Sequence, residues 1–154
     1  MRNINEIIIH CSATKEGKDY TVKQIEQWHL AKGYKKIGYH FVVYRDGTIH
    51  RGRPLAESGA HCLNHNSYSI GICYIGGLDA DGKPKDTRTD AQREALRTLV
   101  TMLKEIYPAA KVLGHRDTSP DKNKNGIIEP AEWLKACPCF DVAEWYNEIK
   151  TTTK

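Results

Sequence analysis

The sequence contains no long hydrophobic run. Its three consecutive isoleucines at 7–9 fall far short of the roughly 20 apolar residues that a membrane-spanning helix needs. Residues 1–6 carry one basic residue, and the apolar run after them is too short for a secretory signal. We therefore expect a protein that is made in the cytoplasm without a signal peptide and that has no membrane partner.

Dense blocks of positive charge are also missing. The net charge is +4, and Lys35-Lys36 is only a pair of basic residues, so no nucleic-acid partner is expected. A mildly basic surface suits an anionic polymer but does not identify one. The five cysteines are an odd number, which argues against a complete disulfide framework and favours a reducing compartment with at least one functional thiol.

Strand and helix patterns alternate along the 154 residues, without an internal repeat or a linker. Thr21 with Gln24, and Thr89 with Gln92, form capping boxes that predict helix starts. The predicted strands are 4–10, 41–44, 48–50, 69–75 and 111–115, and the predicted helices are 21–32, 89–107 and one that follows Asp141. This order predicts an α/β fold: a single domain, residues 1–154, with a central mixed β-sheet flanked by helices. We expect a monomer.

Two histidines stand at the ends of predicted strands. His10 ends the apolar run 7–9, and His115 ends the shorter run 112–114. Together with Cys137 they offer two nitrogens and one sulfur, a set that suits a catalytic zinc ion with its fourth position left to water. Each residue also has a structural interpretation, since single histidines often form only hydrogen bonds and single cysteines often pack as small apolar groups. Cys139 is an alternative third ligand.

Five segments, in order, resemble the zinc-dependent N-acetylmuramoyl-L-alanine amidases of the type 2 family, which includes amidase-type lysozymes of phages and the peptidoglycan recognition proteins. The segments are Ile9-His10-Cys11-Ser12-Ala13-Thr14, Gly38-Tyr39-His40-Phe41, Arg45-Asp46-Gly47-Thr48, His61 through Gly71, and Gly114-His115-Arg116 with Lys135-Ala136-Cys137-Pro138. The match is closest to the phage lysozyme branch, which also uses cysteine as its third ligand. The resemblance implies the fold of that family.

By position, the resemblance makes His10, His115 and Cys137 the zinc ligands, and Tyr39 and Lys135 the catalytic residues. It implies hydrolysis of the amide between N-acetylmuramic acid and L-alanine in peptidoglycan. Lys135 can stabilise the oxyanion of the tetrahedral intermediate. Tyr39 can position water or pass a proton to the leaving amine. The alternatives are a rim aromatic for Tyr39 and a solvated charge for Lys135.

The resemblance also assigns a substrate groove. His61, Asn64 and Asn66 fall on the segment that lines it in the family, although Cys62, Leu63 and Tyr68 depart from the family pattern. Among the other histidines, His40 is expected to hydrogen-bond to backbone or to a ligand histidine. His29, His50 and His65 are expected at the surface, and Cys11 and Cys73 in the core.

A second ion-binding pattern lies between His115 and Cys137. Residues 121–132 match the 12-residue loop of an EF-hand, and we expect an EF-hand-like insertion at 117–133 that binds calcium. The expected calcium ligands are Asp121, Asn123, Asn125, the carbonyl group of Ile127, and Glu132. Pro130 is expected to open a short helix that contains Glu132 and Lys135. The entry helix of an EF-hand is missing, and an ion-free Asn-Gly turn is the alternative.

The leading hypothesis is a zinc amidase that acts on the cell wall once it is released or delivered there. A module that binds peptidoglycan without cutting it is a second hypothesis. An enzyme with Cys137 as nucleophile beside His115 is a third, and it would survive metal removal. The loop alone would also permit a calcium-responsive interaction protein.

Overall fold

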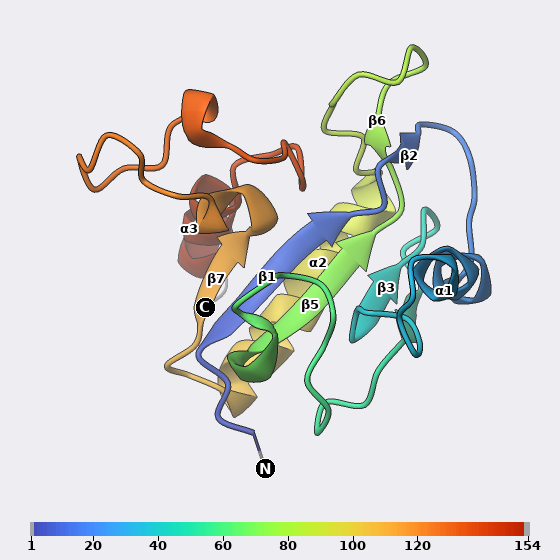
Figure 1. Cartoon of the computed structure of the whole chain (residues 1–154), viewed down its shortest axis with the longest axis horizontal. Helices are drawn as coiled ribbons and strands as arrows, with labels where there is room; N and C mark the ends of the chain where they lie inside the picture. The colour runs from blue at the N-terminus through green and yellow to red at the C-terminus, as the bar shows by residue number, and fades with distance from the viewer. Residues whose placement is uncertain (1, 153–154) are drawn as a thin grey trace.

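The computed structural model of the chain describes residues 2–152, and its centre is a mixed sheet (Figure 1). The strand order is β4-β3-β5-β1-β7, in which only the β3–β4 pair is antiparallel. The strands are β1 (Glu6–Cys11), β3 (Phe41–Val43), β4 (Ile49–Arg51), β5 (Ser69–Tyr74) and β7 (Lys111–Gly114). The predicted α/β class with a mixed sheet is confirmed.

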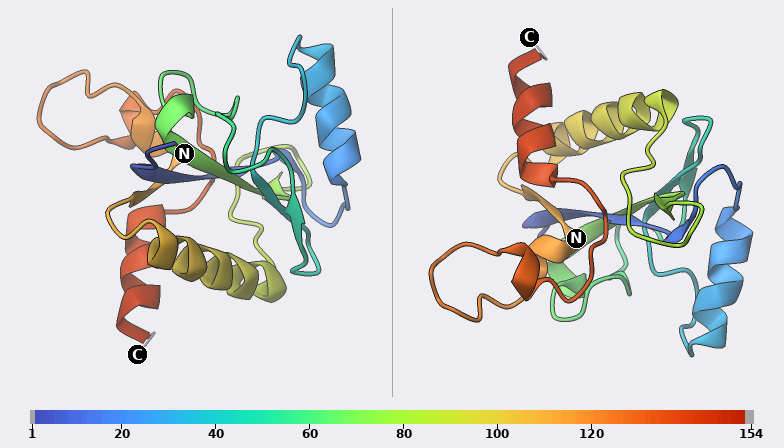
Figure 2. Two further views of the ribbon diagram at one scale, coloured as in Figure 1. Left: turned by 90° about the horizontal axis from the view of Figure 1, so that it is seen from below. Right: turned by 90° about the horizontal axis from the view of Figure 1, so that it is seen from above.

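Helices cover both faces of this sheet. Figure 2 shows α2 (Asp90–Ile106) and α3 (Val142–Thr152) on one face, and α1 (Val22–Ala31) on the other. Both predicted capping boxes are present, with Thr21 and Thr89 as the N-cap residues of α1 and α2. Asp141 accepts a hydrogen bond from the Glu144 N–H at the start of α3. No helix within residues 2–152 has the length and apolar character that crossing a membrane requires.

Side-chain alternation along β1 sets the direction of His10. Ile7, Ile9 and Cys11 belong to the large apolar core that includes side chains of α2 and α3. Because successive side chains of a strand point to opposite faces, His10 points to the face away from those two helices. Its imidazole is only 1% exposed.

The register of the sheet brings His10 and His115 together. β1 and β7 are parallel neighbours, and Ile9 pairs with Gly114. His10 and His115, which directly follow this pair, therefore lie at the same level of the sheet. β7 ends at Gly114, and His115 begins the 3₁₀ helix η2 (His115–Thr118) rather than ending the strand as predicted.

Other local features differ from the sequence prediction. β2 (Thr14–Lys15) and β6 (Gly77–Leu78) form a small parallel ladder that was not predicted. Two further 3₁₀ helices are η1 (Asn66–Tyr68) and η3 (Pro130–Glu132). The predicted helix that would carry both Glu132 and Lys135 is wrong, because η3 is a single turn and Trp133 already has extended backbone.

Candidate active site

His10, His115 and Cys137 form the cluster of metal-ligand type in the described part of the chain. One potential ligand atom from each residue lies within 4.8 Å of the other two. His10 is buried, whereas His115 and Cys137 are partly exposed. The imidazole rings of His10 and His115 are 4.5 Å apart between centroids. A cluster with this burial pattern could hold an ion that is open to solvent on one side.

Backbone contacts fix the thiol of Cys137 in this cluster. The N–H of Cys11 donates to Cys137 Sγ over 3.1 Å, and the N–H of Arg116 donates to the Cys137 carbonyl over 2.8 Å. Cys139 points elsewhere, because its Sγ lies 4.0 Å from Cys11 Sγ and 3.3 Å from the Gly77 carbonyl. Of the two cysteines, Cys137 alone joins the histidines within residues 2–152.

His61 holds the ring of His10. His61 Nδ1 lies 2.8 Å from His10 Nε2, and its own Nε2 lies 3.1 Å from Ser69 Oγ. Sequence reasoning placed His61 in a substrate groove and missed this contact. Gly71 is the signal that could have revealed it, since a Cβ at Gly71 would lie 2.6 Å from the His61 ring.

Both imidazoles of this pair are held neutral. Burial, followed by the neighbouring His61 and His115, lowers the pKa of His10 well below its ordinary value. Burial, followed by His40, lowers the pKa of His61 to about 3. A neutral imidazole is the form that binds a metal ion.

Tyr39 lies against the cluster from the side of β3. Its ring centroid is 5.1 Å from that of His10. Burial, followed by the nearby thiols of Cys73 and Cys137, raises the pKa of Tyr39 well above its ordinary value. The phenol therefore stays protonated at neutral pH and can act as a hydrogen-bond donor.

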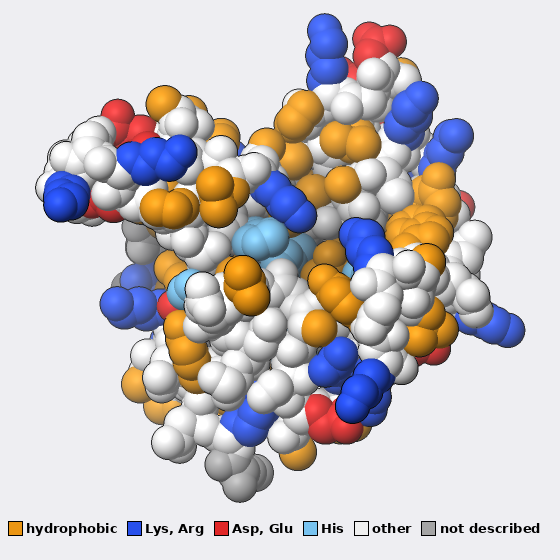
Figure 3. All heavy atoms as spheres, in the orientation of Figure 1, with side chains coloured by type: hydrophobic (Ala, Val, Ile, Leu, Met, Phe, Trp, Pro, Cys, Tyr) orange, Lys and Arg blue, Asp and Glu red, His pale blue; other side chains and the backbone are white. Residues whose placement is uncertain are grey.

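A cleft of about 430 Å³ opens beside the cluster. Figure 3 shows histidine side chains at the bottom of a hollow, with basic and hydrophobic side chains around it. The cleft is lined by Tyr34, Ala60, His61, Cys62, Leu63, Asn66, His115, Thr118, Ser119, Leu134 and Lys135. Lys135 is thus at the cleft. Burial has the largest effect in lowering the pKa of His10, followed by His61 and His115, and the charge of Lys135 lowers it further.

The three predicted groove residues differ in their positions. His61 and Asn66 line the cleft, and Asn64 does not. Asn66 shapes the wall, because its Oδ1 accepts hydrogen bonds from the N–H groups of His61 and Cys62, both over 2.9 Å. Leu63 and Leu134 are 83% and 71% exposed at the same cleft, and sequence reasoning gave neither a role. They offer apolar surface to a ligand.

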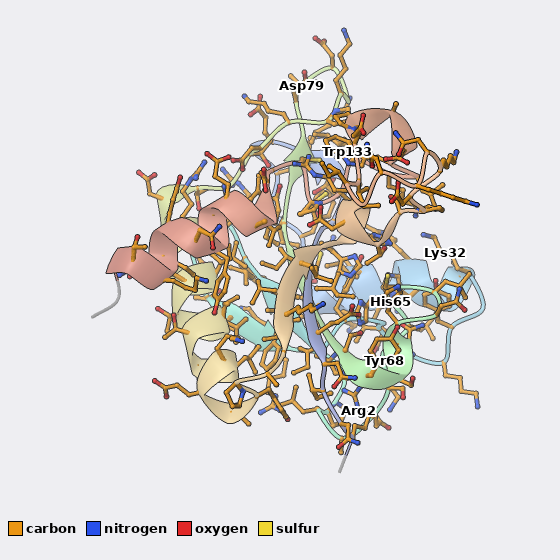
Figure 4. The ribbon with its side chains drawn as sticks, turned by 90° about the vertical axis from the view of Figure 1, so that its left-hand side faces the viewer. Arg2, Lys32, His65, Tyr68, Asp79 and Trp133 are labelled. Carbon is orange, nitrogen blue, oxygen red and sulfur yellow. The ribbon has the colours of Figure 1, made fainter. Side chains whose placement is uncertain are left out.

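The remaining histidines have structural partners. His40 accepts a hydrogen bond from the Gly71 N–H and bonds to the Glu57 carbonyl, as the sequence predicted for a backbone partner. His29 was predicted at the surface, and this prediction is wrong. It is 8% exposed, and its Nδ1 accepts a hydrogen bond from the Gly38 N–H over 2.8 Å. His65, labelled in Figure 4, lies 2.7 Å from Glu6.

The predicted calcium ligands lie in the segment that projects from the sheet beside β7 (Figure 1). Asn123, Asn125 and Ile127 are exposed, Asp121 is partly buried, and Glu132 is buried. This segment is separate from the histidine cluster, but Leu134 and Lys135 at its end line the cleft.

The sheet brings two imidazoles and a thiol together beside an open cleft, and this is the kind of three-ligand set and concave site that a catalytic metal ion requires. The chain belongs to the N-acetylmuramoyl-L-alanine amidase family, whose pattern matches residues 1–127, and it is an enzyme of that class. The matched range includes His10 and His115 and ends before Cys137.

Individual proteins support this assignment. The endolysin of Klebsiella phage KP32 is 41% identical over 150 residues, covering 96% of this chain and 90% of that protein. The endolysin of Escherichia phage T7 is 37% identical, with the same coverage. Among solved structures, the N-acetylmuramoyl-L-alanine amidase LysC from Clostridium intestinale URNW is similar, with a TM-score of 0.73 and 26% identity over 98% of this chain and 85% of that one. Drosophila PGRP-LB gives a TM-score of 0.70 and 25% identity over 94% of this chain and 80% of that one.

Proposed function

We propose that this enzyme hydrolyses the amide bond between N-acetylmuramic acid and L-alanine in peptidoglycan, with zinc held by His10, His115 and Cys137. The observation that carries the proposal is the cluster of two nitrogens and one sulfur within 4.8 Å at the edge of an open cleft. The family and the phage endolysins at 37% to 41% identity support the substrate.

The donor set fits zinc. Two imidazoles and one thiolate are ligands that Zn²⁺ binds in catalytic sites with three protein ligands. The N–H of Cys11, 3.1 Å from Cys137 Sγ, fixes the sulfur beside the two imidazoles. When bound, zinc supplies Lewis acidity, which lowers the pKa of water and polarises a carbonyl group.

Lys135 and Tyr39 are proposed to act on the substrate. The Lys135 ammonium at the cleft would stabilise the negative charge that develops on the amide oxygen. Tyr39 keeps its proton because its pKa is raised by burial and the neighbouring thiols, so it would donate a hydrogen bond to water or to the leaving amine.

The cleft walls are proposed to orient the sugar and the peptide. Asn66 and His61 line the wall, where the Asn66 amide nitrogen is the polar group left to contact substrate, and Leu63 offers apolar surface for a methyl group of the substrate. Asn64 is exposed outside the cleft and remains a prediction as a substrate contact. The residues of the calcium loop predicted at 121–132 supply no group that acts on the substrate in this scheme.

We expect His61→Ala to weaken zinc binding about 10- to 100-fold, the usual effect of losing the group that orients a ligand histidine. The physical reason is the 2.8 Å contact between His61 Nδ1 and His10 Nε2. Competition with a chelating dye measures the affinity. His50→Ala, which removes an imidazole from β4, is the matched control and should bind zinc normally. Unchanged affinity in His61→Ala would show that His61 does not orient His10.

Two other functions make different predictions. A binding module would retain peptidoglycan without releasing fragments. An enzyme that uses Cys137 as nucleophile would keep its activity after zinc is removed by a chelator, whereas a zinc amidase would lose activity and recover it when zinc is restored.

Digestion of purified peptidoglycan tests the reaction directly. We expect released peptides with new L-alanine N-termini and glycan strands that keep intact lactyl groups, identified by mass analysis. Fragments cut within the glycan strand or at peptide cross-links would refute the proposed bond specificity. Wall action in a cell then requires that the enzyme be released or delivered to the wall.

A further inference from the structure

We propose that residues 121–132 bind one calcium ion, and that this ion holds in place the segment that carries Lys135 to the cleft. The spacing of oxygen ligands is the first observation. Asp121, Asn123, Asn125 and Glu132 occupy positions 1, 3, 5 and 12 of the loop, and the Ile127 carbonyl occupies position 7. Gly126 at position 6 has φ +83, the left-handed backbone that the sharp turn of such a loop requires.

The two ends of the loop bring two carboxyl groups together. The side chain of Asp121 lies beside Glu132, which is only 5% exposed. Backbone hydrogen bonds, that of Glu129 first, lower the pKa of Glu132, so its carboxylate is charged at neutral pH. A cation between positions 1 and 12 would offset the negative charge gathered there.

One carboxylate oxygen of Asp121 lacks a hydrogen-bond partner. Asp121 Oδ2 accepts a hydrogen bond from the Gly126 N–H over 2.7 Å, but Asp121 Oδ1 is buried without a hydrogen bond. Within residues 2–152, neither Asp121 nor Glu132 forms an ion pair with lysine or arginine. A buried carboxylate oxygen without a donor is unfavourable, and metal coordination satisfies it.

The chemistry of the donors selects calcium. Every candidate donor is oxygen, from carboxylates, amides and one backbone carbonyl, so the loop differs in kind from the imidazole and thiolate cluster that suits zinc. Lys122 and Lys124 are exposed and add positive charge, and two ligand positions hold neutral asparagine. We therefore expect affinity at the weak end for such loops, with a Kd on the order of 10⁻⁴ to 10⁻³ M.

Contacts at the base of the loop connect it to the cleft. The N–H of Leu134 donates to Ser119 Oγ over 3.1 Å, which closes the segment on itself. Trp133, labelled in Figure 4, lies under the guanidinium of Arg116, 3.9 Å from the ring centroid. Ser119, Leu134 and Lys135 line the cleft, so an ion that ties position 1 to position 12 also restrains the wall that carries Lys135.

Binding is tested on the zinc-loaded enzyme after calcium is removed with a calcium-selective chelator. Calorimetric titration with calcium chloride should give one site per chain, and magnesium should bind more weakly.

Terbium bound in the loop should give emission that is sensitised by Trp133. Calcium should displace the terbium and remove this emission, and Trp133→Phe should abolish it. Glu132→Gln should weaken calcium binding at least about 10-fold, as expected when the bidentate ligand of position 12 is lost. Asp121→Asn is a second variant, because Glu132 also accepts backbone hydrogen bonds within the loop.

Glu105→Gln, which removes one carboxylate from α2, is the control and should bind calcium as the unmodified enzyme does. Absence of heat and of terbium emission would overturn the site. The effect on the cleft rests on the proposed function: calcium should raise hydrolysis several-fold in the unmodified enzyme and not in Glu132→Gln. An unchanged rate in the presence of bound calcium would overturn the restraint on Lys135. A chain that cleaves no peptidoglycan would still give the calorimetric result, so the two failures are distinguishable.

Discussion

Cys137→Ser should lose its zinc and at least about 100-fold of its hydrolytic rate, since loss of a ligand should exceed the 10- to 100-fold effect of losing a residue that only supports a ligand. Serine is nearly isosteric with cysteine, so the hydrogen bond from the Arg116 N–H to the carbonyl of residue 137 can persist, and the Cys11 N–H can donate to the serine hydroxyl in place of Sγ. What changes is the donor atom: a hydroxyl group remains protonated at neutral pH and is a poor zinc ligand. The readouts are zinc per chain after dialysis and the rate of peptide release.

Cys139→Ser is the matched control. Its side chain lies beside Cys11 and the Gly77 carbonyl rather than beside the histidines, so this variant should keep one zinc ion and nearly full activity. The pair of variants also decides between the two cysteines that the sequence left open. If Cys137→Ser kept its zinc while Cys139→Ser lost it, the ligand assignment would be reversed.

The strand-end histidines show how much of the site the sequence could predict. The apolar runs before His10 and His115 predicted two strands, and the carboxyl ends of parallel neighbours lie at the same end of a sheet. The sequence pattern could not determine that β1 and β7 are neighbours, because strand order depends on how α2 and α3 pack. The resemblance to the amidase family implied only that His10 and His115 come together as ligands of one metal ion.

Local sequence patterns could not predict the contacts between residues that lie far apart along the chain. The contact of His61 with His10 depends on the close approach of the loop before β5, which the absence of a side chain at Gly71 permits. The burial of His29 depends on the Gly38 N–H, which belongs to the loop after α1. The prediction of a helix through Lys135 was wrong. Pro130 does begin a helical turn, but the backbone becomes extended at Trp133, before Lys135 is reached.

Lys135→Ala should lower kcat about 10²- to 10³-fold while zinc content stays at one ion per chain, the usual effect of removing one group that stabilises an oxyanion. The ammonium lines the cleft, and its effect on the pKa of His10 indicates that its field extends to the cluster. Because the charge on the amide oxygen develops only in the transition state, KM for a soluble muramoyl peptide should change little.

Two further variants separate this role from a general attraction to an anionic wall polymer. Lys135→Arg keeps the positive charge and should recover part of kcat, although its planar donor group cannot take the same position as an ammonium. Lys23→Ala removes an exposed charge from α1, outside the cleft, and should leave kcat unchanged. If Lys135→Ala raised KM with kcat intact, the lysine would serve substrate binding alone, because an interaction of equal strength in the ground state and the transition state does not accelerate the chemical step.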